Sequence, residues 1–358
     1  MLAALLVLGP ESSKAAADLA VGECAEGITK ESSSSDSAML GWTQTPLACL
    51  EVLGRSMVER TVGYFQQSGV EEICILADRS MAHAQLDVEH TANGISVTWV
   101  ANAWGAITQK LTSFRDTGVE TAFVVGMDAY AEFDPLPALQ FHRERKHVLT
   151  RAVGADGPLN IWIADVARMA DEIASQDEQD ENDAFSHAGT DAAYTVPGYI
   201  NRLQSAKDLR RLVTDALHSR CNFHPIGQEV RPGIWLGDGA QIHRGARIVS
   251  PAFVGRNSKV GDDCLVTRCS NIENDCEIDY GTAVEDSSVL SNSYVGIGLD
   301  IAHSIVNGRN LLNLKRDKAL EIADPAVIRQ NISLPKRKVH GSSAESFGLE
   351  GMLFEPAE

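Results

Sequence analysis

The stretch LGDGAQIHRGARIVSPAFVGRNSKVGDDCLVTRCSNIENDCEIDYGTAVEDSSVL, residues 236–290, carries an aliphatic residue at every sixth position. The series is Leu236, Ile242, Ile248, Val254, Val260, Val266, Ile272, Ile278, Val284 and Leu290. A second series stands four positions after each aliphatic residue, and nine of its ten members are small: Ala240, Ala246, Ala252, Ser258, Cys264, Ser270, Cys276, Thr282, Ser288 and Tyr294. The pattern then slips by one position and resumes at Val295 and Ile301.

A period of six matches neither the 3.6 residues of a helix nor the alternation of a hairpin strand. It is typical of a left-handed parallel β-helix, in which three hexads make one triangular coil and one aliphatic per hexad stacks inside. A Gly-rich β-sandwich would not keep this register. Ten hexads predict a little over three coils, with a helical cap over 311–330 until Pro325.

Upstream of the hexads, short apolar runs alternate with amphipathic ones. The predicted strands are 2–8, 72–76, 95–100, 121–125, 148–153 and 160–164. The predicted helices are 57–67, 106–114, 135–146 and a connecting helix over 203–218. This alternation indicates an α/β domain with a largely parallel sheet covered on both faces, whose ligands lie beyond the carboxyl ends of the strands.

We therefore expect an α/β domain over 1–204, a connecting helix and loop over 205–231, the β-helix over 232–310, and a capping helix and tail over 311–358. Two segments interrupt the pattern. Residues 10–41 are rich in Ser, Ala and Gly, and residues 175–192 form an acidic run. Residues 10–41 are too polar and small for a core, and residues 175–192 are a solvated acidic loop with no obvious ligand.

Composition excludes some partners. Lys and Arg total 31 against 49 Asp and Glu, a formal charge of −18, which disfavours nucleic acid and anionic membranes. Seven cysteines without a CxxC pair argue against a disulfide framework and favour a cytoplasmic protein. The apolar run 2–8 is not preceded by a basic residue, so it predicts a buried strand better than a signal peptide, and no run is long enough to span a bilayer.

Several short stretches of the sequence are informative because of the order in which they occur along the chain. They are PLACLEVLGRSM at 46–57 with SGVEEI at 68–73, WGA at 104–106, VVGMD at 124–128 with His142 fourteen residues on, and YINRLQSAKDL at 199–209. Together with the hexads, this order resembles the sugar-nucleotide pyrophosphorylases, which join a nucleoside triphosphate to a sugar 1-phosphate. The resemblance extends over about residues 1–310.

The resemblance implies a Rossmann-like nucleotidyltransferase domain before the β-helix. It places Gly105 and Ala106 at the family's Gly-Thr-Ala motif, where they would contact a nucleotide or nucleotide sugar. It places Asp128 at the position of a metal-binding aspartate. In this family the attack on the α-phosphorus requires basic groups and Mg²⁺, usually held between two carboxylates.

The sequence departs from the family at most catalytic positions. The first strand is followed by GPESSK at 9–14, without the family's Gly-x-Gly-Thr-Arg loop. Thr45 replaces the lysine of the Pro-Lys-Pro motif, and the second aspartate falls at Asn201 or Arg202. Pro10 removes a backbone donor and Glu11 adds a negative charge where phosphates would bind. These losses predict weak or absent turnover.

The candidate residues have simpler explanations as well. Asp128 follows a strand, where Asp often caps a turn, and Gly105 could serve the start of a helix. Arg55 and Lys14 are candidate anion-binding residues. His142 is expected to be a packing or surface histidine, because His147, five residues on, lies about 140° away around a helix and cannot share a metal with it.

Three hypotheses remain open. The first is a nucleotide-sugar sensor or non-catalytic partner of an active relative. The second is a divergent nucleotidyltransferase in which Lys14, Lys30 or Arg55 supplies the lost charge and Asp128 holds Mg²⁺. The third is an oligomeric assembly module, or a hexapeptide acyltransferase using His243 or His303 as general base.

Overall fold

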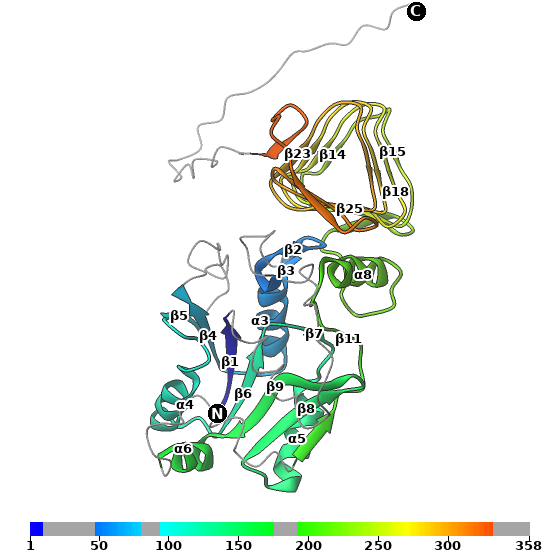
Figure 1. The fold of residues 1–358 in the computed structure, drawn as a ribbon. Helices are drawn as coiled ribbons and strands as arrows, with labels where there is room; N and C mark the ends of the chain where they lie inside the picture. The colour runs from blue at the N-terminus through cyan, green and yellow to red at the C-terminus, as the bar shows by residue number, and fades with distance from the viewer. Residues whose placement is uncertain (10–46, 80–93, 175–191, 332–358) are drawn as a thin grey trace, which may run out of the picture.

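The computed structural model describes residues 1–9, 47–79, 94–174 and 192–331. The chain forms an α/β domain followed by a three-sided coil of short parallel strands (Figure 1). None of the helices in these ranges is long and apolar enough to cross a membrane.

The first strand, β1 (Leu2–Leu8), lies inside a seven-stranded sheet and is covered on both faces. Ala4, Leu6 and Leu8 belong to one hydrophobic cluster, and Ala3, Leu5 and Val7 belong to another. Successive side chains of a strand point to opposite faces, so an all-apolar strand requires a layer on each side. The predicted buried strand is confirmed.

The sheet has the order β10-β8-β9-β6-β1-β4-β5. Four of its six pairings are parallel, and β9 is antiparallel to both β6 and β8. Its other strands are β4 (Glu72–Asp78), β5 (Ile95–Val100), β6 (Thr121–Gly126), β8 (Leu149–Gly154), β9 (Gly157–Asp165) and β10 (Ala192–Thr195). The sheet is mostly parallel, as the sequence predicts, and the two antiparallel pairings of β9 make it mixed.

Helices cover both faces of this sheet. One face carries α3 (Met57–Gln67) and α5 (Pro135–Arg145), and the other carries α4 (Ile107–Asp116) and α6 (Val166–Ala174). The sequence predicts three of these helices within two residues at each end and misses α6. Ser56 begins α3 with a capping box, since its hydroxyl accepts from the Glu59 N–H and the Glu59 carboxylate accepts from the Ser56 N–H.

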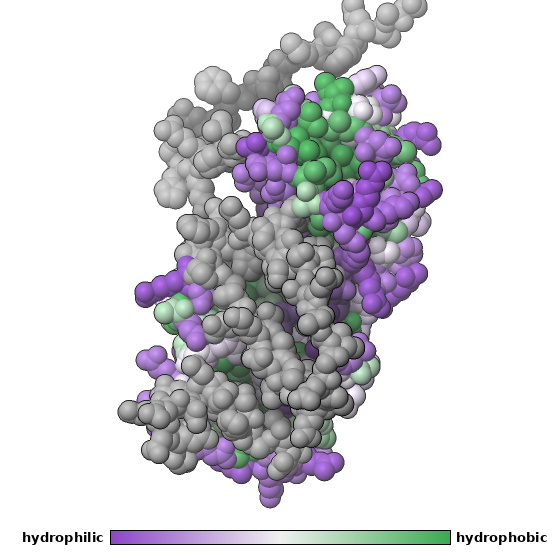
Figure 2. All heavy atoms as spheres, in the orientation of Figure 1, coloured by the Kyte–Doolittle hydropathy of each residue, from purple (hydrophilic) through white to green (hydrophobic). Residues whose placement is uncertain are grey.

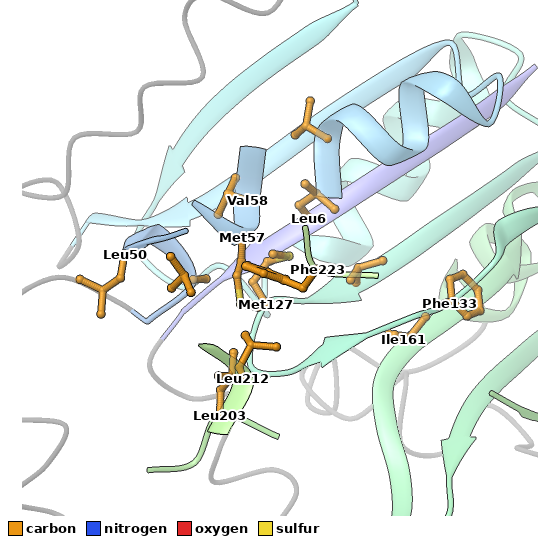
Figure 3. Close-up of a cluster of buried hydrophobic side chains, with 14 of the residues drawn as sticks. Leu6, Leu50, Met57, Val58, Met127, Phe133, Ile161, Leu203, Leu212 and Phe223 are labelled. Atoms are coloured by element: carbon orange, nitrogen blue, oxygen red, sulfur yellow. The ribbon is translucent and has the colours of Figure 1, made fainter. Parts of the chain in front are cut away.

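The connecting helix α8 (Ala206–Leu217) has Ser205 as its N-cap. Its buried side chains belong to the hydrophobic core that the α/β domain shares with the coil. Figure 3 shows how Leu6, Met57 and Met127 approach Leu212 of α8 and Phe223, which follows it. Five shorter elements complete the domain: η1 (Leu47–Cys49), the hairpin β2 (Glu51–Val52) and β3 (Arg55–Ser56), and the antiparallel pair β7 (Tyr130–Ala131) and β11 (Ile200–Asn201).

Three parallel ladders form the walls of the coil, and through its first turns each residue pairs with the one 18 positions later. The first wall contains β13 (Ile234–Leu236), β16 (Ala252–Val254), β19 (Asn271–Ile272), β22 (Ser288–Val289) and β25 (Ser304–Asn307). The second contains β14 (Gln241–Ile242), β17 (Lys259–Val260), β20 (Glu277–Ile278) and β23 (Ser293–Val295). The third contains β15 (Arg247–Ile248), β18 (Leu265–Thr267), β21 (Ala283–Glu285) and β24 (Asp300–Ala302).

The hexad aliphatics stack inside the coil as predicted, except at the slip. Ile272 pairs with Val289, only 17 positions on, so Val289 is the interior residue and Leu290 joins the core shared with the α/β domain. The slip therefore occurs one hexad earlier than the sequence predicts. This also accounts for Tyr294, because the small interior residue of that hexad is Ser293, which is fully buried.

The small residues tie successive turns together at the corners. The Ser270 hydroxyl donates to the Val284 carbonyl and accepts from the Ser287 N–H, and the Ser287 hydroxyl repeats the pattern with Ile301 and Ser304. A buried backbone donor is costly when unpaired. The small residues therefore satisfy turn hydrogen bonds as well as leaving room for the corner.

Thirteen parallel strands make four turns and one further strand, more than the three turns that ten hexads predict. The predicted capping helix over 311–330 is wrong. That segment forms β26 (Asn310–Asn313) and β27 (Lys318–Glu321), which extend the first wall, and β28 (Ile328–Gln330), which pairs with β23. The last turn exposes strand edges, and antiparallel hairpins satisfy them in a way that a helix cannot.

Hydrophobic residues gather on the part of the coil surface that Figure 2 shows, with hydrophilic residues around them. The large hydrophobic residues most exposed on the coil are Val230, Val249, Tyr280, Ile297 and Leu320.

Candidate functional site

Asp128 lies just beyond the end of β6, at the carboxyl edge of the parallel strands, where the sequence predicts a ligand site. Its Oδ2 accepts a 2.7 Å hydrogen bond from Asn160 Nδ2. Its Oδ1 is buried and has no hydrogen-bond partner among the described residues. Burial raises the pKa of the Asp128 carboxyl, and its hydrogen bonds and the charges of Arg202 and Arg151 act against this shift.

Trp104 packs against Gly126, two residues before Asp128, because two glycines leave room for its indole. A Cβ on Gly126 would lie 2.9 Å from the Trp104 ring and 2.8 Å from Asn160 Cβ, and a Cβ on Gly9 would lie 3.4 Å from Trp104 Cδ1. Trp104 meets Trp162 edge to face, with ring centroids 5.7 Å apart. The Trp104 Nε1 donor is buried without a partner among the described residues.

Arg151 closes the other side of this cluster. Its guanidinium lies 5.2 Å from the centroid of Trp162 and donates to the Leu159 carbonyl at 3.1 Å. Arg202 donates to the carbonyls of Gly157 and Pro158 at the start of the same strand, β9. The edge of the sheet thus combines one carboxylate, two indoles and two guanidiniums.

Gly105 and Ala106 lie beside Trp104, before α4, but their backbone donors are engaged locally. The Gly105 N–H donates to Asn102 Oδ1 at 3.0 Å, and the Ala106 N–H donates to the Asn102 carbonyl at 3.2 Å. In this conformation Asn102 takes the two donors that the resemblance assigns to a nucleotide.

The remaining predicted residues lie elsewhere. Arg55 is exposed on the β2–β3 hairpin, and this hairpin lies next to the coil (Figure 1). Lys14 and Lys30 lie outside the described residues. Asn201, at the family's second aspartate position, is buried and holds the turn before α8, donating to the Asp208 carbonyl and accepting from the Leu203 N–H.

The histidines hold structural positions. His142 is buried, and its Nδ1 lies 2.8 Å from the Thr150 hydroxyl, which agrees with a packing histidine. Burial lowers the pKa of His142 to about 4. On the coil, His243 pairs with Asp262 at 2.9 Å and His303 pairs with Asp286 at 2.6 Å.

A second buried polar cluster lies between the α/β domain and the coil. Glu273, fully buried, accepts from the backbone N–H groups of Leu53 and Gly54 at 2.8 and 2.9 Å and from Asn271 Nδ2 at 2.5 Å. Burial raises the pKa of Glu273 to about 7, and these hydrogen bonds limit the rise. Glu51 lies in the same contact, where burial also raises its pKa.

Arg210 of α8 anchors the other half of this contact. It is 5% exposed and donates to the Cys269 carbonyl at 2.7 Å and to Asp286 at 3.1 Å. Asp286 also holds His303, so this histidine belongs to an Arg–Asp–His chain at the domain boundary. One row of residues in the first wall faces the α/β domain. The members of this row pair in register from strand to strand: Phe253, Asn271, Ser288 and Ile305.

The sequence misses Asn160, Arg151, Glu273 and Arg210. Asn160 had one available signal, a polar residue at the start of an otherwise apolar strand. The other three had none, since their partners are distant in sequence. Among the described residues, no three His, Cys, Asp or Glu side chains are grouped to hold a metal ion.

A scan against models of known protein families found no match for this chain. A search of curated proteins found no match either.

Proposed function

We propose that this chain is a nucleotide-sugar-binding protein of the sugar-nucleotide pyrophosphorylase type, with a Rossmann-like domain, a left-handed β-helix and weak or absent turnover. It would act in the cytoplasm as a sensor or as the non-catalytic partner of an active relative. The ligand would lie against Trp104 and Asp128 at the edge of the sheet.

The observation that carries this proposal is that Asp128 Oδ1, a buried acceptor, and Trp104 Nε1, a buried donor, both lack hydrogen-bond partners among the described residues. Buried polar groups in proteins are nearly always hydrogen-bonded. A polyhydroxylated ligand supplies both a donor and an acceptor, and the indoles supply an apolar surface for a base or a sugar ring.

The described residues do not form a Mg²⁺ site by themselves. Magnesium favours octahedral oxygen ligands. Here a single carboxylate has one oxygen bonded to Asn160 and two guanidiniums nearby. This arrangement supports binding more than nucleotidyl transfer.

A thermal-shift screen of nucleoside triphosphates and nucleotide sugars, each with and without Mg²⁺, tests binding. A ligand that binds the native state raises the midpoint by mass action. Trp104→Phe keeps the apolar ring and removes the donor, so we expect about tenfold weaker binding. Asp156→Asn, in an exposed turn of the same domain, is the control. Absence of any shift with every nucleotide ligand would contradict the proposal.

One feature favours a second candidate, an active divergent nucleotidyltransferase. Asp128 Oδ1 has no hydrogen bond among the described residues and is available to a Mg²⁺ ion brought by a triphosphate. Pyrophosphate release from each triphosphate with glucose or mannose 1-phosphate distinguishes the two. Robust turnover that Asp128→Asn abolishes supports the enzyme and rejects the non-catalytic proposal.

A further inference from the structure

The first turn of the coil is open. No residue from 235 to 251 is buried, although this turn carries Leu236, Ile242 and Ile248 at the interior positions. One turn later the stacked residues Val254, Val260 and Val266 are at most 2% exposed. At the other end Val295, Ile301 and Val306 are also buried, beneath the hairpins that follow them.

Two strand edges border this opening. Among the described residues β14 pairs only with β17, and β15 pairs only with β18. The first wall is protected there by the antiparallel strand β12 (Gln228–Arg231). An edge with half-exposed aliphatics beside it is a template for one more strand.

The charge at this opening differs from that of the whole chain. Residues 228–249 carry Arg231, Arg244 and Arg247 against Glu229 and Asp238, in a protein of net charge −18. These three arginines are exposed and form no ion pair with any described residue. A second copy docked about a two-fold axis would bring the arginines against each other, so the edge favours an acidic occupant.

We propose that residues 344–358 of the same chain, AESFGLEGMLFEPAE, dock in extended conformation along the open edge of the first turn, first on β14 and then, past the corner, on β15. This segment lies outside the described residues. It carries Glu345, Glu350, Glu355 and Glu358 and no basic residue. Phe347 and Leu353 are six positions apart, as Ile242 and Ile248 are, so they can cover these two residues, while Glu350 between them is available to the arginines.

The connection is long enough. Twelve residues, 332–343, separate the end of the described chain at Asn331 from this segment. They span up to about 40 Å when extended. Asn331 follows β28, which pairs with β23, and β14 lies four strands from β28 in the same sheet. At about 4.8 Å per strand this is about 19 Å.

Hydrogen exchange of the full chain tests the docking. In Glu350→Lys/Glu355→Lys, amides of residues 240–249 should exchange at least fivefold faster than in the wild type. Arg244→Glu/Arg247→Glu should have the same effect, and combining the two pairs should restore exchange to within about twofold of the wild type. Lys315→Glu/Arg316→Glu, exposed on the opposite end, is the control with the same change of charge. Equal exchange in all variants would overturn the proposal.

A binding measurement guards against a folding defect in those variants. The synthetic peptide 344–358 should bind the full chain carrying Glu→Gln at all four segment positions. Arg244→Glu/Arg247→Glu in that chain should weaken binding at least tenfold. Failure of the peptide to bind at millimolar concentration, or protection of 240–249 that grows with protein concentration, would reject the intramolecular strand, the latter in favour of a second copy.

Discussion

Glu273 accepts the backbone N–H groups of Leu53 and Gly54, 220 and 219 positions earlier in the chain, and thereby fixes the β2–β3 hairpin against the coil. Leu53 and Gly54 both have positive φ, 52° and 90°. A Cβ on Gly54 would lie 3.1 Å from the Phe253 ring. The tight hairpin turn is therefore shaped to present two donors to one buried carboxylate.

Stability should fall as pH rises through the titration of Glu273. Its pKa is about 7 when folded against 4.5 for the free side chain, so the native state keeps a proton that the unfolded chain has lost. The stabilising contribution is complete below about pH 4.5 and lost as pH rises through 7. It is on the order of 3 kcal/mol. Urea unfolding from pH 5 to 8 should show this slope in the wild type and a weaker slope in Glu273→Gln, because Glu51 also has a raised pKa, while Glu277→Gln keeps the full slope.

His142 should produce the opposite slope on the acid side. Burial lowers its pKa to about 4, so the unfolded chain takes up a proton that the native state refuses. Its contribution is complete above about pH 6.5 and lost as pH falls toward 4. His142→Gln should flatten the acid limb of the same unfolding measurements. An unchanged acid limb in this variant would show that His142 is protonated in the native state.

Truncation of Arg210 should weaken the contact between the α/β domain and the coil. Arg210→Ala leaves the Cys269 carbonyl without the Arg210 donor and leaves Asp286 with His303 as its partner, and we expect a loss of about 2 to 4 kcal/mol. Arg210→Lys keeps the charge but cannot reach both acceptors with a planar fork, so it should recover only part of the loss. Limited proteolysis between 218 and 227 should accelerate in proportion to the loss.

Replacing Gly126 and Gly63 by alanine, one at a time, should change the stability of the protein in opposite directions. Gly126→Ala pushes a methyl group into Trp104 and Asn160, which should cost about 1 to 3 kcal/mol and change the tryptophan emission. Gly63 lies inside α3 with open space around it, so Gly63→Ala should stabilise by about 0.5 to 1 kcal/mol. Thermal unfolding with fluorescence detection compares the pair; equal midpoints would show that Trp104 yields to the methyl group.

The corner hydrogen bonds should be measurable at Ser270. Ser270→Ala leaves the Ser287 N–H without its acceptor in a buried corner, at a cost of about 1 to 3 kcal/mol. Ser270→Cys should cost less, because Cys264 and Cys276 occupy equivalent corners and also donate to carbonyls. Equal losses in both variants, read by urea unfolding, would assign the effect to packing alone.

The sequence by itself determined the alternation of β1 to α5 and the stacked interior of the coil. Both follow from local periodicity, since apolar spacing fixes which face of a strand or helix is buried. It failed at 311–330, where the spacing is helix-like but the open edges of the last turn recruit the chain as strands.

Only the tertiary structure decided the partners of Glu273, Arg210 and Asp128. Nothing in the local sequence distinguishes Glu273 from the other acidic residues. The fold brings the N–H groups of Leu53 and Gly54 to it from about 220 positions away. In the sequence Asp128 is only an aspartate at the end of a strand, whereas in the structure one of its oxygens accepts a hydrogen bond from Asn160. Burial and hydrogen bonding set the charge state of such groups, and both depend on contacts between residues that no local pattern relates.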